Sequence, residues 1–256
     1  MLLSVVIPVY NERHTLGTIL GVVARTLPNV SKEIIVIDDC SNDGTREWLK
    51  ANFQDGARSG SSVDLDNDGL LVFAQEAGPS RVTVRPIFHE RYTAKEADLQ
   101  TGFAAMSGDI LVIQNADLEY DPNDWQSMYD LIAVRKVANV VFGSRFYGRP
   151  HCSLYFHHYL ANRLISFLFN IAFNQTLTDI ETCYKMMTRE VARSLRLTAN
   201  DFGIEVEMSA EIARQRTLHI YELGISYYGR TCAEGKKINW QDGLKALWYV
   251  FKCHFR

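Results

Sequence analysis

The sequence predicts an α/β fold with a mostly parallel central sheet and helices on both of its faces. Two segments, 3–9 (LSVVIPV) and 33–39 (EIIVIDD), are short, continuous and rich in β-branched residues, which is typical of strands buried on both faces. The segment between them places apolar residues at helical spacing: Leu16, Ile19, Leu20 and Val23. A chain of 256 residues, 47% of them hydrophobic, is also long enough to bury a full core.

The alternation of strand and helix continues to residue 145. A helix is expected over 41–53, with Ser41 or Asn42 as its N-cap. Further strands are predicted over 81–90, 109–114 and 138–145, and further helices over 94–108 and 121–134, the last with Pro122 in its first turn. Such alternation gives a parallel sheet that binds its ligands at the carboxyl ends of the strands.

Residues 54–80 interrupt this alternation and are expected to form an inserted surface loop, because they are rich in Gly, Ser and Asp. Their DLDNDG segment matches the start of a calcium-binding loop at Asp64, Asp66, Asp68 and Gly69. The twelfth position of such a loop should be Glu, whereas this chain has Gln75, and no clear helix precedes the segment. An acidic loop is the favoured interpretation, with calcium binding as the alternative.

The second half of the chain has a different character. Helices are predicted over 154–174, 202–215 and 240–255. Residues 178–187 are a polar segment running into a strand, 218–230 form another strand, and 229–238 form a basic loop. No internal repeat and no linker is visible, so we expect a single domain over residues 1–256.

Composition and charge argue against several classes of protein. The net charge is -3 and the sequence pI is about 6.2, without the basic excess of a nucleic-acid-binding protein. The N-terminal residues are interpreted as a first strand rather than a signal peptide, and the longest apolar stretch, 164–173, has about half of the roughly 20 residues that a membrane span needs. The cysteines form no CxxC pair and are expected to be reduced thiols in a cytoplasmic protein: Cys40, Cys152, Cys183, Cys232 and Cys253.

Polar side chains follow the first two predicted strands, which end in PVYNE and DDCSNDGT. Tyr10, Glu12, Asp38 and Asp39 are expected to form a rim over the sheet, where a ring could stack on Tyr10 and a carboxylate could accept hydrogen bonds from a base or ribose. Capping of the next helix is the alternative role for Asp38 or Asp39. Dinucleotide and P-loop sites are not expected, because no GxGxxG follows the first strand and no GxxxxGKS or GxxxxGKT occurs.

A third polar cluster lies in GDILVIQNADLEYDP, residues 108–122. Asn115, Asp117 and Glu119 alternate along the chain and offer the oxygen ligands that hard cations prefer. The first of them is an amide, whose carbonyl oxygen can coordinate a cation but lacks the charge of a carboxylate. Asp117 is therefore the expected anchor of a metal site, Glu119 its second carboxylate, and Asn115 either a neutral ligand or a bystander.

These motifs resemble a known family. The segments VVIPVYNE, EIIVIDDCSNDGT, TGFAAMSGDILVIQNADLEYDP and VVFGSRF together resemble family 2 glycosyltransferases of the GT-A fold. The later segments TDIETCYKMM and YYGRTCAEGKKI look like the branch that contains dolichyl-phosphate mannose synthase and related polyprenyl-phosphate sugar transferases. The resemblance covers nearly the whole chain except residues 54–80. It implies a nucleotide-diphosphate sugar as donor, inversion at the anomeric carbon, and Mg²⁺ or Mn²⁺ as cofactor.

The resemblance also implies a role for each motif residue. The nucleotide-binding residues are Pro8, Tyr10, Glu12, Asp39 and Lys95, although the AKEADLQTG around Lys95 lacks the family's glycines. The metal-binding residues are Asn115, Asp117 and Glu119. The catalytic residues are Asp117, Arg145, Asp179 and Glu181. The residues for the acceptor phosphate are Arg163 and members of a mobile basic loop: Arg230, Lys236 and Lys237.

The expected reaction is transfer of a hexose-like sugar to a polyprenyl phosphate by a cytoplasmic or peripheral protein at the inner face of the membrane, with residues 151–256 completing the acceptor side. A phosphate acceptor is already an anion and needs no general base. A sugar or protein hydroxyl is the alternative acceptor and needs one, for which Asp179 or Glu181 is best placed. A sugar-nucleotide-binding protein without turnover is a further alternative. A homo-oligomer is left open, because the apolar helix over 156–174 suits a core, a dimer contact or a lipid tail.

Overall fold

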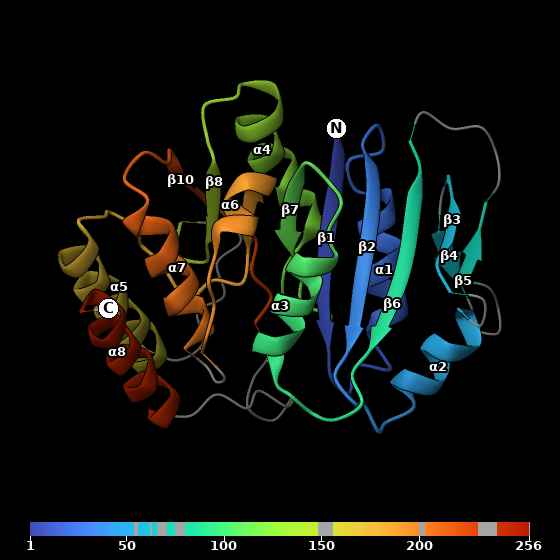
Figure 1. Ribbon diagram of the computed structural model, residues 1–256, viewed down its shortest axis with the longest axis horizontal. Coiled ribbons are helices and arrows are strands. Elements are labelled where there is room, and N and C mark those ends of the chain that lie inside the picture. Colours follow the sequence, from blue (N-terminus) through green and yellow to red (C-terminus); the bar gives the residue numbers. More distant parts are fainter. Residues whose placement is uncertain are drawn as a thin grey trace.

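The computed structural model describes residues 1–53, 56–61, 63–65, 71–74, 80–147, 156–199, 203–229 and 240–255. Within these ranges the main sheet has eight strands in the order β10-β8-β9-β7-β1-β2-β6-β3 (Figure 1). Its strands are β1 (Leu2–Val9), β2 (Ser31–Asp38), β3 (Arg58–Gly60), β6 (Val82–Phe88), β7 (Ile110–Ile113), β8 (Val140–Ser144), β9 (Lys185–Thr188) and β10 (Ile220–Gly224). A separate hairpin pairs β4 (Val63–Leu65) with β5 (Leu71–Phe73).

Strand β1 lies at the centre of the parallel part of the sheet. It pairs in parallel with β2 on one side and β7 on the other, and β6 pairs in parallel with β2. Strand β9 is antiparallel to both of its neighbours, β7 and β8, and β3 is antiparallel to β6. The carboxyl ends of β1, β2, β6 and β7 therefore lie along one edge of the sheet, at the bottom of Figure 1, and this edge is called the carboxyl edge below.

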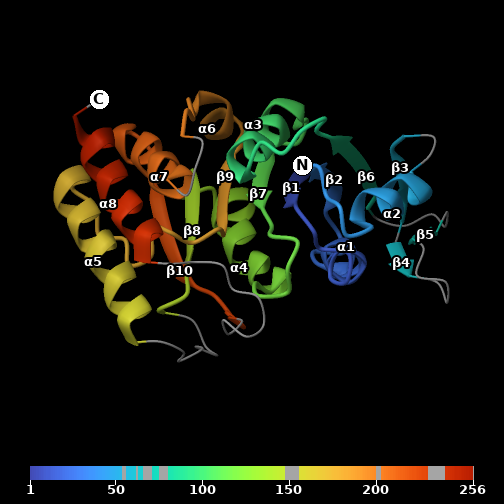
Figure 2. The same ribbon diagram turned by 90° about the horizontal axis from the view of Figure 1, so that it is seen from below.

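Helices cover both faces of the sheet (Figure 2). The core on one face includes residues of α1 (Leu16–Arg25), α2 (Thr45–Asn52) and α4 (Trp125–Tyr129). The core on the other face includes residues of α3 (Lys95–Ala105), α5 (Phe156–Phe173), α6 (Arg189–Ser194), α7 (Ile204–Arg214) and α8 (Trp240–His254). The pleat of β1 explains the division, because Val5 and Ile7 belong to the first core and Val6 belongs to the second.

The predicted α/β fold, with a mostly parallel sheet and helices on both faces, is confirmed. The expectation of a surface loop over 54–80 needs correction, because the described parts of this segment form β3, β4 and β5. Val63, Leu71 and Phe73 are buried in the core that contains α1 and α2. These side chains make strand formation favourable, but the surrounding Gly, Ser and Asp residues conceal them in the sequence. Of the calcium-like residues, Asp64 pairs with Arg25 at 2.5 Å, and Asp66, Asp68, Gly69 and Gln75 lie outside the described residues.

Other elements differ from the sequence prediction in their details. The helix predicted over 121–134 consists of a 3₁₀ turn (Pro122–Asp124), α4 and a π-helical turn (Asp130–Val134). The helix predicted over 41–53 begins only at Thr45, after Gly44 with a φ of 94°. The predicted strand after 178 is β9, and helix α6 follows it directly. In the described part of the chain, every helix is too short or too polar to cross a bilayer.

Candidate active site

Asp39 directly follows β2 at the carboxyl edge and is 1% exposed. Its Oδ1 accepts hydrogen bonds from the backbone N–H and the hydroxyl of Thr93, at 2.8 and 2.9 Å, and its Oδ2 accepts one from the N–H of Ala94 at 2.8 Å. These donors compensate the carboxylate for the loss of water. Asp39 thereby fixes the segment that leads into α3.

The backbone of this segment is strained at Ala94. Its φ of 69° and ψ of 164° fall in a region that favours glycine, because a Cβ atom clashes with the backbone there. The hydrogen bond from its N–H to Asp39 holds the residue in this conformation. The AKEADLQTG segment has alanine at position 94 and therefore keeps a glycine-like conformation there at the cost of strain.

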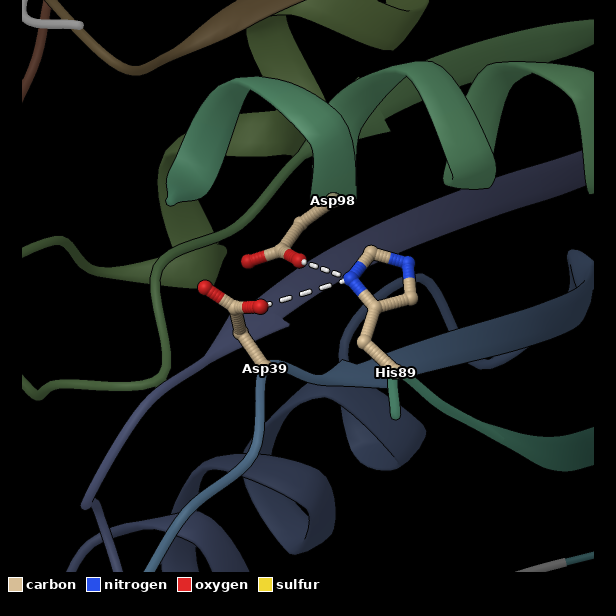
Figure 3. Close-up of side chains that lie close together, drawn as sticks. All are labelled: Asp39, His89 and Asp98. Carbon is tan, nitrogen blue, oxygen red and sulfur yellow. Dashed lines mark hydrogen bonds and ion pairs between the residues drawn. The ribbon is translucent and has the colours of Figure 1, made fainter. Parts of the chain in front are cut away.

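His89, which follows β6, lies between two carboxyl groups (Figure 3). Its Nδ1 is 3.1 Å from Oδ1 of Asp98 on α3 and 3.4 Å from Oδ1 of Asp39. Its other nitrogen, Nε2, is 2.9 Å from the hydroxyl of Thr101. Burial raises the pKa of Asp98 to about 8, and the carboxylates of Asp39 and Glu96 push it in the same direction. Asp98 is therefore mostly protonated at neutral pH, which reduces the repulsion within the group.

Asp39, His89 and Asp98 also have the spacing of a group that can hold a metal ion, since one ligand atom from each lies within 4.8 Å of the others. The ligand types, one imidazole and two carboxyl groups, suit a divalent transition metal. However, three N–H and O–H donors already point at the Asp39 carboxylate. A cation bound there would have to compete with these donors.

Two aromatic rings lie beside Asp39 at the carboxyl edge. Tyr10, which follows β1, packs against Tyr92 with ring centroids 4.7 Å apart and an interplanar angle of 53°. Both rings are exposed, and Pro8 at the end of β1 is partly buried. Glu12 accepts a hydrogen bond from the hydroxyl of Thr15 at 2.8 Å. The aromatic surface and the carboxylates thus occupy the rim that the sequence predicts.

Asp38 has a different role from its neighbour. It is fully buried, and its Oδ2 accepts a 2.6 Å hydrogen bond from Nε of Arg46 on α2. Its Oδ1 accepts a longer bond, 3.4 Å, from the N–H of Ser41. Asp38 therefore stabilises the turn that leads into α2. It does not cap that helix, because the N-cap is Gly44 and no side chain accepts a capping hydrogen bond there.

The metal ledge, defined as Asn115, Asp117 and Glu119, follows β7. Oδ1 of Asn115 accepts a hydrogen bond from Nζ of Lys95 at 3.2 Å, and its Nδ2 donates to Sγ of Cys183 at 3.2 Å. Asp117 is partly exposed, and its Oδ1 accepts a bond from the N–H of Glu119 at 3.2 Å. The carbonyl oxygen of Asn115 is thus directed at an ammonium group, whereas Asp117 lies where solvent reaches it.

Lys95, which is partly exposed, belongs to a network with two buried charges, Lys185 and Glu205. Its Nζ is 3.1 Å from Oε1 of Glu205 on α7, and Nζ of Lys185 on β9 is 2.8 Å from Oε2 of the same carboxylate. Burial opposes the charged form of Glu205, but Lys185 and Lys95 outweigh this effect and lower its pKa to about 2. The network joins α3, α7 and β9, so the ammonium of Lys95 has a structural partner in addition to any role toward a ligand.

Arg145 and Asp179 form a two-point ion pair near the ledge. Nε and Nη2 of Arg145 each donate to a different oxygen of Asp179 at 2.7 Å, and Asp179 is 1% exposed. Oε1 of Glu222 on β10 accepts hydrogen bonds from the N–H groups of Thr178 and Asp179, at 2.8 and 3.1 Å, which fixes the turn that carries this carboxylate. Asp179 is therefore committed to Arg145 and is poorly suited to accept a proton.

Glu181 is two positions after Asp179 in the chain, and Arg163 lies close to this pair in the fold. Burial raises the pKa of Glu181 to about 7, against the opposing effect of Arg145. Unlike Asp179, Glu181 is partly exposed. Arg163 on α5 donates from Nη1 to the carbonyl oxygen of Thr178 at 3.4 Å.

The predicted site residues thus separate into groups. The structure brings Arg145 together with Asp179 and places Asn115 against Lys95. The predicted basic-loop residues, Arg230, Lys236 and Lys237, lie outside the described residues. Several partners were not anticipated: His89, Asp98, Lys185, Glu205, Glu222 and Tyr227. Lys185 and Glu205 carried a usable signal, because each is a charged residue inside an apolar segment and opposite buried charges tend to pair.

Comparison with known proteins agrees with the resemblance inferred from the motifs. Residues 4–63 and 62–196 match the family described as Glycosyl transferase family 2. A dolichol-phosphate mannosyltransferase of Pyrococcus furiosus is 24% identical over 242 residues, and a glycosyltransferase named AglJ of Haloferax volcanii is 26% identical over 223 residues. These matches cover 93% and 87% of this chain, which spans only 61% and 62% of the length of those two relatives.

A third relative is an undecaprenyl-phosphate 4-deoxy-4-formamido-L-arabinose transferase of Salmonella choleraesuis. It is 29% identical over 123 residues, which are 47% of this chain and 30% of that protein. Among solved structures, glucosyl-3-phosphoglycerate synthase from Mycobacterium tuberculosis, in complex with Mn²⁺, UDP and phosphoglyceric acid, has a TM-score of 0.65 at 18% identity. That likeness covers 98% of this chain and 78% of the other, and it identifies the GT-A fold.

We predict that replacing Ala94 with glycine stabilises the protein. The substitution removes the Cβ atom from a strained conformation and leaves the N–H to Asp39 in place, so the free energy of unfolding should rise by about 1 kcal/mol despite the greater freedom of the unfolded chain. Ala97→Gly, in the first turn of α3, is the matched control and should lower it by up to about 1 kcal/mol. Denaturant unfolding measures both, and a loss of stability in Ala94→Gly would contradict the strain.

We predict that Glu205→Gln destabilises the fold by about 3–5 kcal/mol at pH 7, because it leaves the ammonium groups of Lys95 and Lys185 without their counter-charge. The pKa of Glu205 is lowered, so its stabilising effect is present above its unfolded pKa and is lost as the pH falls from about 4.5 toward 2. The difference from wild type should shrink over that range in urea titrations. Glu211→Gln, which breaks a partly exposed pair with Arg214 on the same helix, should cost less, about 1 kcal/mol.

Proposed function

This chain belongs to glycosyl transferase family 2, and on that premise we propose that it transfers a sugar from a nucleotide-diphosphate sugar to a polyprenyl phosphate, with inversion at the anomeric carbon. Two of the relatives described above are named for dolichol phosphate and undecaprenyl phosphate, which supports a lipid-phosphate acceptor. The chain spans 61% of the length of the first of them, so the activity of the whole protein is part of the proposal.

The observation that carries the proposal is that Tyr227 contacts both the metal ledge and Arg145. The hydroxyl of Tyr227 donates to Oε2 of Glu119 at 2.8 Å, and the guanidinium of Arg145 lies 5.5 Å from the centre of the Tyr227 ring. The side chain of Tyr227 therefore lies between Glu119, a carboxylate that could bind a divalent cation, and the positive charge of Arg145. This arrangement suits a diphosphate leaving group, which gains negative charge as the sugar departs.

Asp117 and Glu119 are the residues that fit a Mg²⁺ or Mn²⁺ ion, because they offer carboxylate oxygens that such hard cations prefer. When bound, the ion would neutralise the charge that develops on the diphosphate. We propose that Asn115 is not a ligand, since its carbonyl oxygen accepts the hydrogen bond from Lys95. The group of Asp39, His89 and Asp98 is less suitable, because the Asp39 carboxylate already holds the backbone of residues 93 and 94.

The donor nucleoside is proposed to bind over Tyr10, Tyr92 and Asp39, between the ends of β1 and β2. Tyr10 and Tyr92 provide exposed aromatic surface on which a base can stack. Asp39 and its neighbours provide hydrogen-bonding groups at the same edge. Glu12, at the start of the loop after β1, is placed to accept hydrogen bonds from a ribose.

The reaction itself needs little proton transfer when the acceptor is a phosphate. An oxygen of the phosphate attacks the anomeric carbon, the bond from that carbon to the diphosphate breaks, and its electron pair leaves with the nucleoside diphosphate. Arg145, held by Asp179, and Arg163 provide positive charge for the phosphates. Because Asp179 is committed to Arg145, the site has one remaining predicted candidate for a general base, Glu181.

Transfer to a hydroxyl is the second candidate function, and the pKa of Glu181 favours it. A carboxylate with a pKa of about 7 is well matched to accept a proton near neutral pH. We favour the phosphate acceptor because two of the relatives are named for a lipid phosphate and because Arg145 and Arg163 suit an anion. The third hypothesis is a protein that binds a sugar nucleotide without transferring the sugar. Nucleotide binding without any product would support it.

We predict that the protein, with Mn²⁺ and a panel of UDP- and GDP-sugars, forms a glycosylated product from a short-chain polyprenyl phosphate but not from the matching polyprenol. Asp117→Asn should lower the rate at least about a hundredfold and weaken the Mn²⁺ dependence of nucleotide binding, because the ledge loses its central charge. Asn115→Ala should retain that Mn²⁺ dependence.

The products are separated by chromatography and identified by mass. Nucleotide binding without any product would support the sugar-nucleotide-binding alternative. Product from the polyprenol or from a soluble glycan, with none from the phosphate, would refute the proposed acceptor.

We predict that Glu181 makes transfer to the phosphate acceptor weaker above pH 7. Its pKa is about 7, so a rise from pH 6 to pH 8 places a negative charge in the field of Arg145, which should raise the KM for the acceptor by roughly tenfold. Glu181→Gln should keep the same kcat at pH 6 and show a smaller rise. The acceptor phosphate also ionises in this pH range, but it does so equally for both proteins. The KM of the wild type divided by the KM of Glu181→Gln at the same pH therefore reports the effect of Glu181 alone. Loss of kcat in Glu181→Gln at every pH would instead identify Glu181 as a general base.

A further inference from the structure

The largest gathering of exposed apolar side chains among the described residues lies on α5 and α8. Each side chain in this gathering is more than 40% exposed. The residues are Phe156, Tyr159, Leu160, Leu164, Phe167 and Ile171 on α5, Leu244, Trp248 and Phe251 on α8, and Phe255 directly after α8. We name this set the apolar face. Single exposed apolar residues are common on protein surfaces, but a contiguous group of this kind marks a contact surface.

The apolar face follows helical spacing on both helices. On α5 the stripe consists of residues three or four positions apart: Phe156, Leu160, Leu164, Phe167 and Ile171. The three residues on α8 and Phe255 directly after it have the same spacing. The opposite sides of the helices are buried in the core, through Ile165 and Phe169 on α5 and Ala246 and Val250 on α8. The two helices lie side by side at the β10 end of the sheet (Figures 1 and 2). Both stripes therefore point away from the protein.

The charges beside the apolar face are mostly basic. The sequences of α5 and α8 contain three basic residues, Arg163, Lys245 and Lys252, against one acidic residue, Asp242 at the start of α8. The whole chain has a net charge of -3, so this is a local excess of positive charge. An amphipathic surface with aromatic residues and a basic border is the composition that binds anionic lipid headgroups. A symmetric contact with a second copy would instead bring these basic borders close to each other.

The same helix reaches the candidate active site on its other side. Oδ1 of Asn162 accepts a hydrogen bond from Nη2 of Arg145 at 3.4 Å, and Arg163 contacts Thr178 next to Asp179. Removing a polyprenyl tail from lipid is costly, at about 0.8 kcal/mol for each CH₂ group brought into water. An acceptor phosphate can therefore reach Arg145 most readily if the surface that holds its tail lies against α5.

We propose that the apolar face is a docking surface for an anionic phospholipid bilayer, on which α5 and α8 lie in the plane of the headgroups. The proposal deepens the proposed function, on which it rests only for the identity of the lipid acceptor. Docking of this kind buries the aromatic and aliphatic side chains at the level of the acyl chains and places Lys245 and Lys252 among the phosphates. It leaves the carboxyl edge open to a soluble nucleotide sugar.

The test is co-sedimentation of the full chain with vesicles of phosphatidylcholine containing phosphatidylglycerol. The wild type is expected to bind them, and Phe167→Ser combined with Phe251→Ser should weaken binding by at least about tenfold. Val134→Ser removes an equally exposed apolar side chain from the π-helical turn on the other face and should leave binding unchanged. Lys245→Gln with Lys252→Gln should reduce binding mainly at low salt. Thermal unfolding of each variant checks that the fold is kept.

Two outcomes would overturn the proposal. One is absence of binding by the wild type, or equal binding by the wild type and the double Ser variant. The other is a lipid-free dimer in sedimentation velocity that the double Ser variant converts to a monomer, since that result would assign the apolar face to a second copy.

A transfer assay separates failure of docking from failure of the proposed function. With a water-soluble short-chain polyprenyl phosphate, the double Ser variant should work at the wild-type rate, whereas with a long-chain acceptor in vesicles it should lose at least about tenfold. Vesicle binding without transfer to either acceptor would support the proposed docking surface and refute the proposed transfer to a polyprenyl phosphate. Transfer to the short-chain acceptor without vesicle binding would support the proposed transfer and refute the docking surface.

Discussion

The need to compensate buried carboxylates organises the carboxyl edge of this sheet. Asp39, Asp179 and Glu205 have little contact with solvent, and each obtains its donors from a distant segment: the turn before α3, Arg145 after β8, and the lysines of α3 and β9. A buried carboxylate without donors would cost several kcal/mol, so each of these pairings holds a segment where local sequence preference would not place it. The partly exposed Asp117 and Glu181 are then presented on a frame that the buried pairs keep rigid.

The order of strands and helices could be predicted from the sequence to residue 145, because buried parallel strands leave short continuous apolar runs and the helices between them leave a periodic pattern. The antiparallel placement of β9 between β7 and β8 could not, since nothing in KMMT specifies its direction or its neighbours. Strands β3, β4 and β5 could not be predicted for another reason. Each has three residues, so its apolar pattern is too short to stand out from the Gly, Ser and Asp around it.

The location of the candidate site was predictable, but its bonding was not. Motif position placed Tyr10, Asp39 and Asp117 at strand ends, and parallel topology brings strand ends together. Which polar atom meets which depends on side-chain geometry across segments far apart in the chain. Asn115 illustrates this: the sequence left it as a ligand or a bystander, and its contact with Lys95, 20 positions away, gives its oxygen a partner inside the protein.

The two sides of α5 connect the chemistry to its setting. A soluble hydroxyl acceptor would gain nothing from the apolar face, because it could diffuse to Arg145 from water without the helix touching any lipid. A polyprenyl phosphate differs, since its charged end would enter the proposed site beside Arg145 and Arg163 while its tail stays in hydrocarbon. A helix that presents Asn162 and Arg163 to the site and Phe167 and Ile171 outward meets both requirements within three turns. The position of the acceptor phosphate would then be set by the depth at which α5 lies in the headgroups, so that membrane docking and acceptor choice are two consequences of one amphipathic helix.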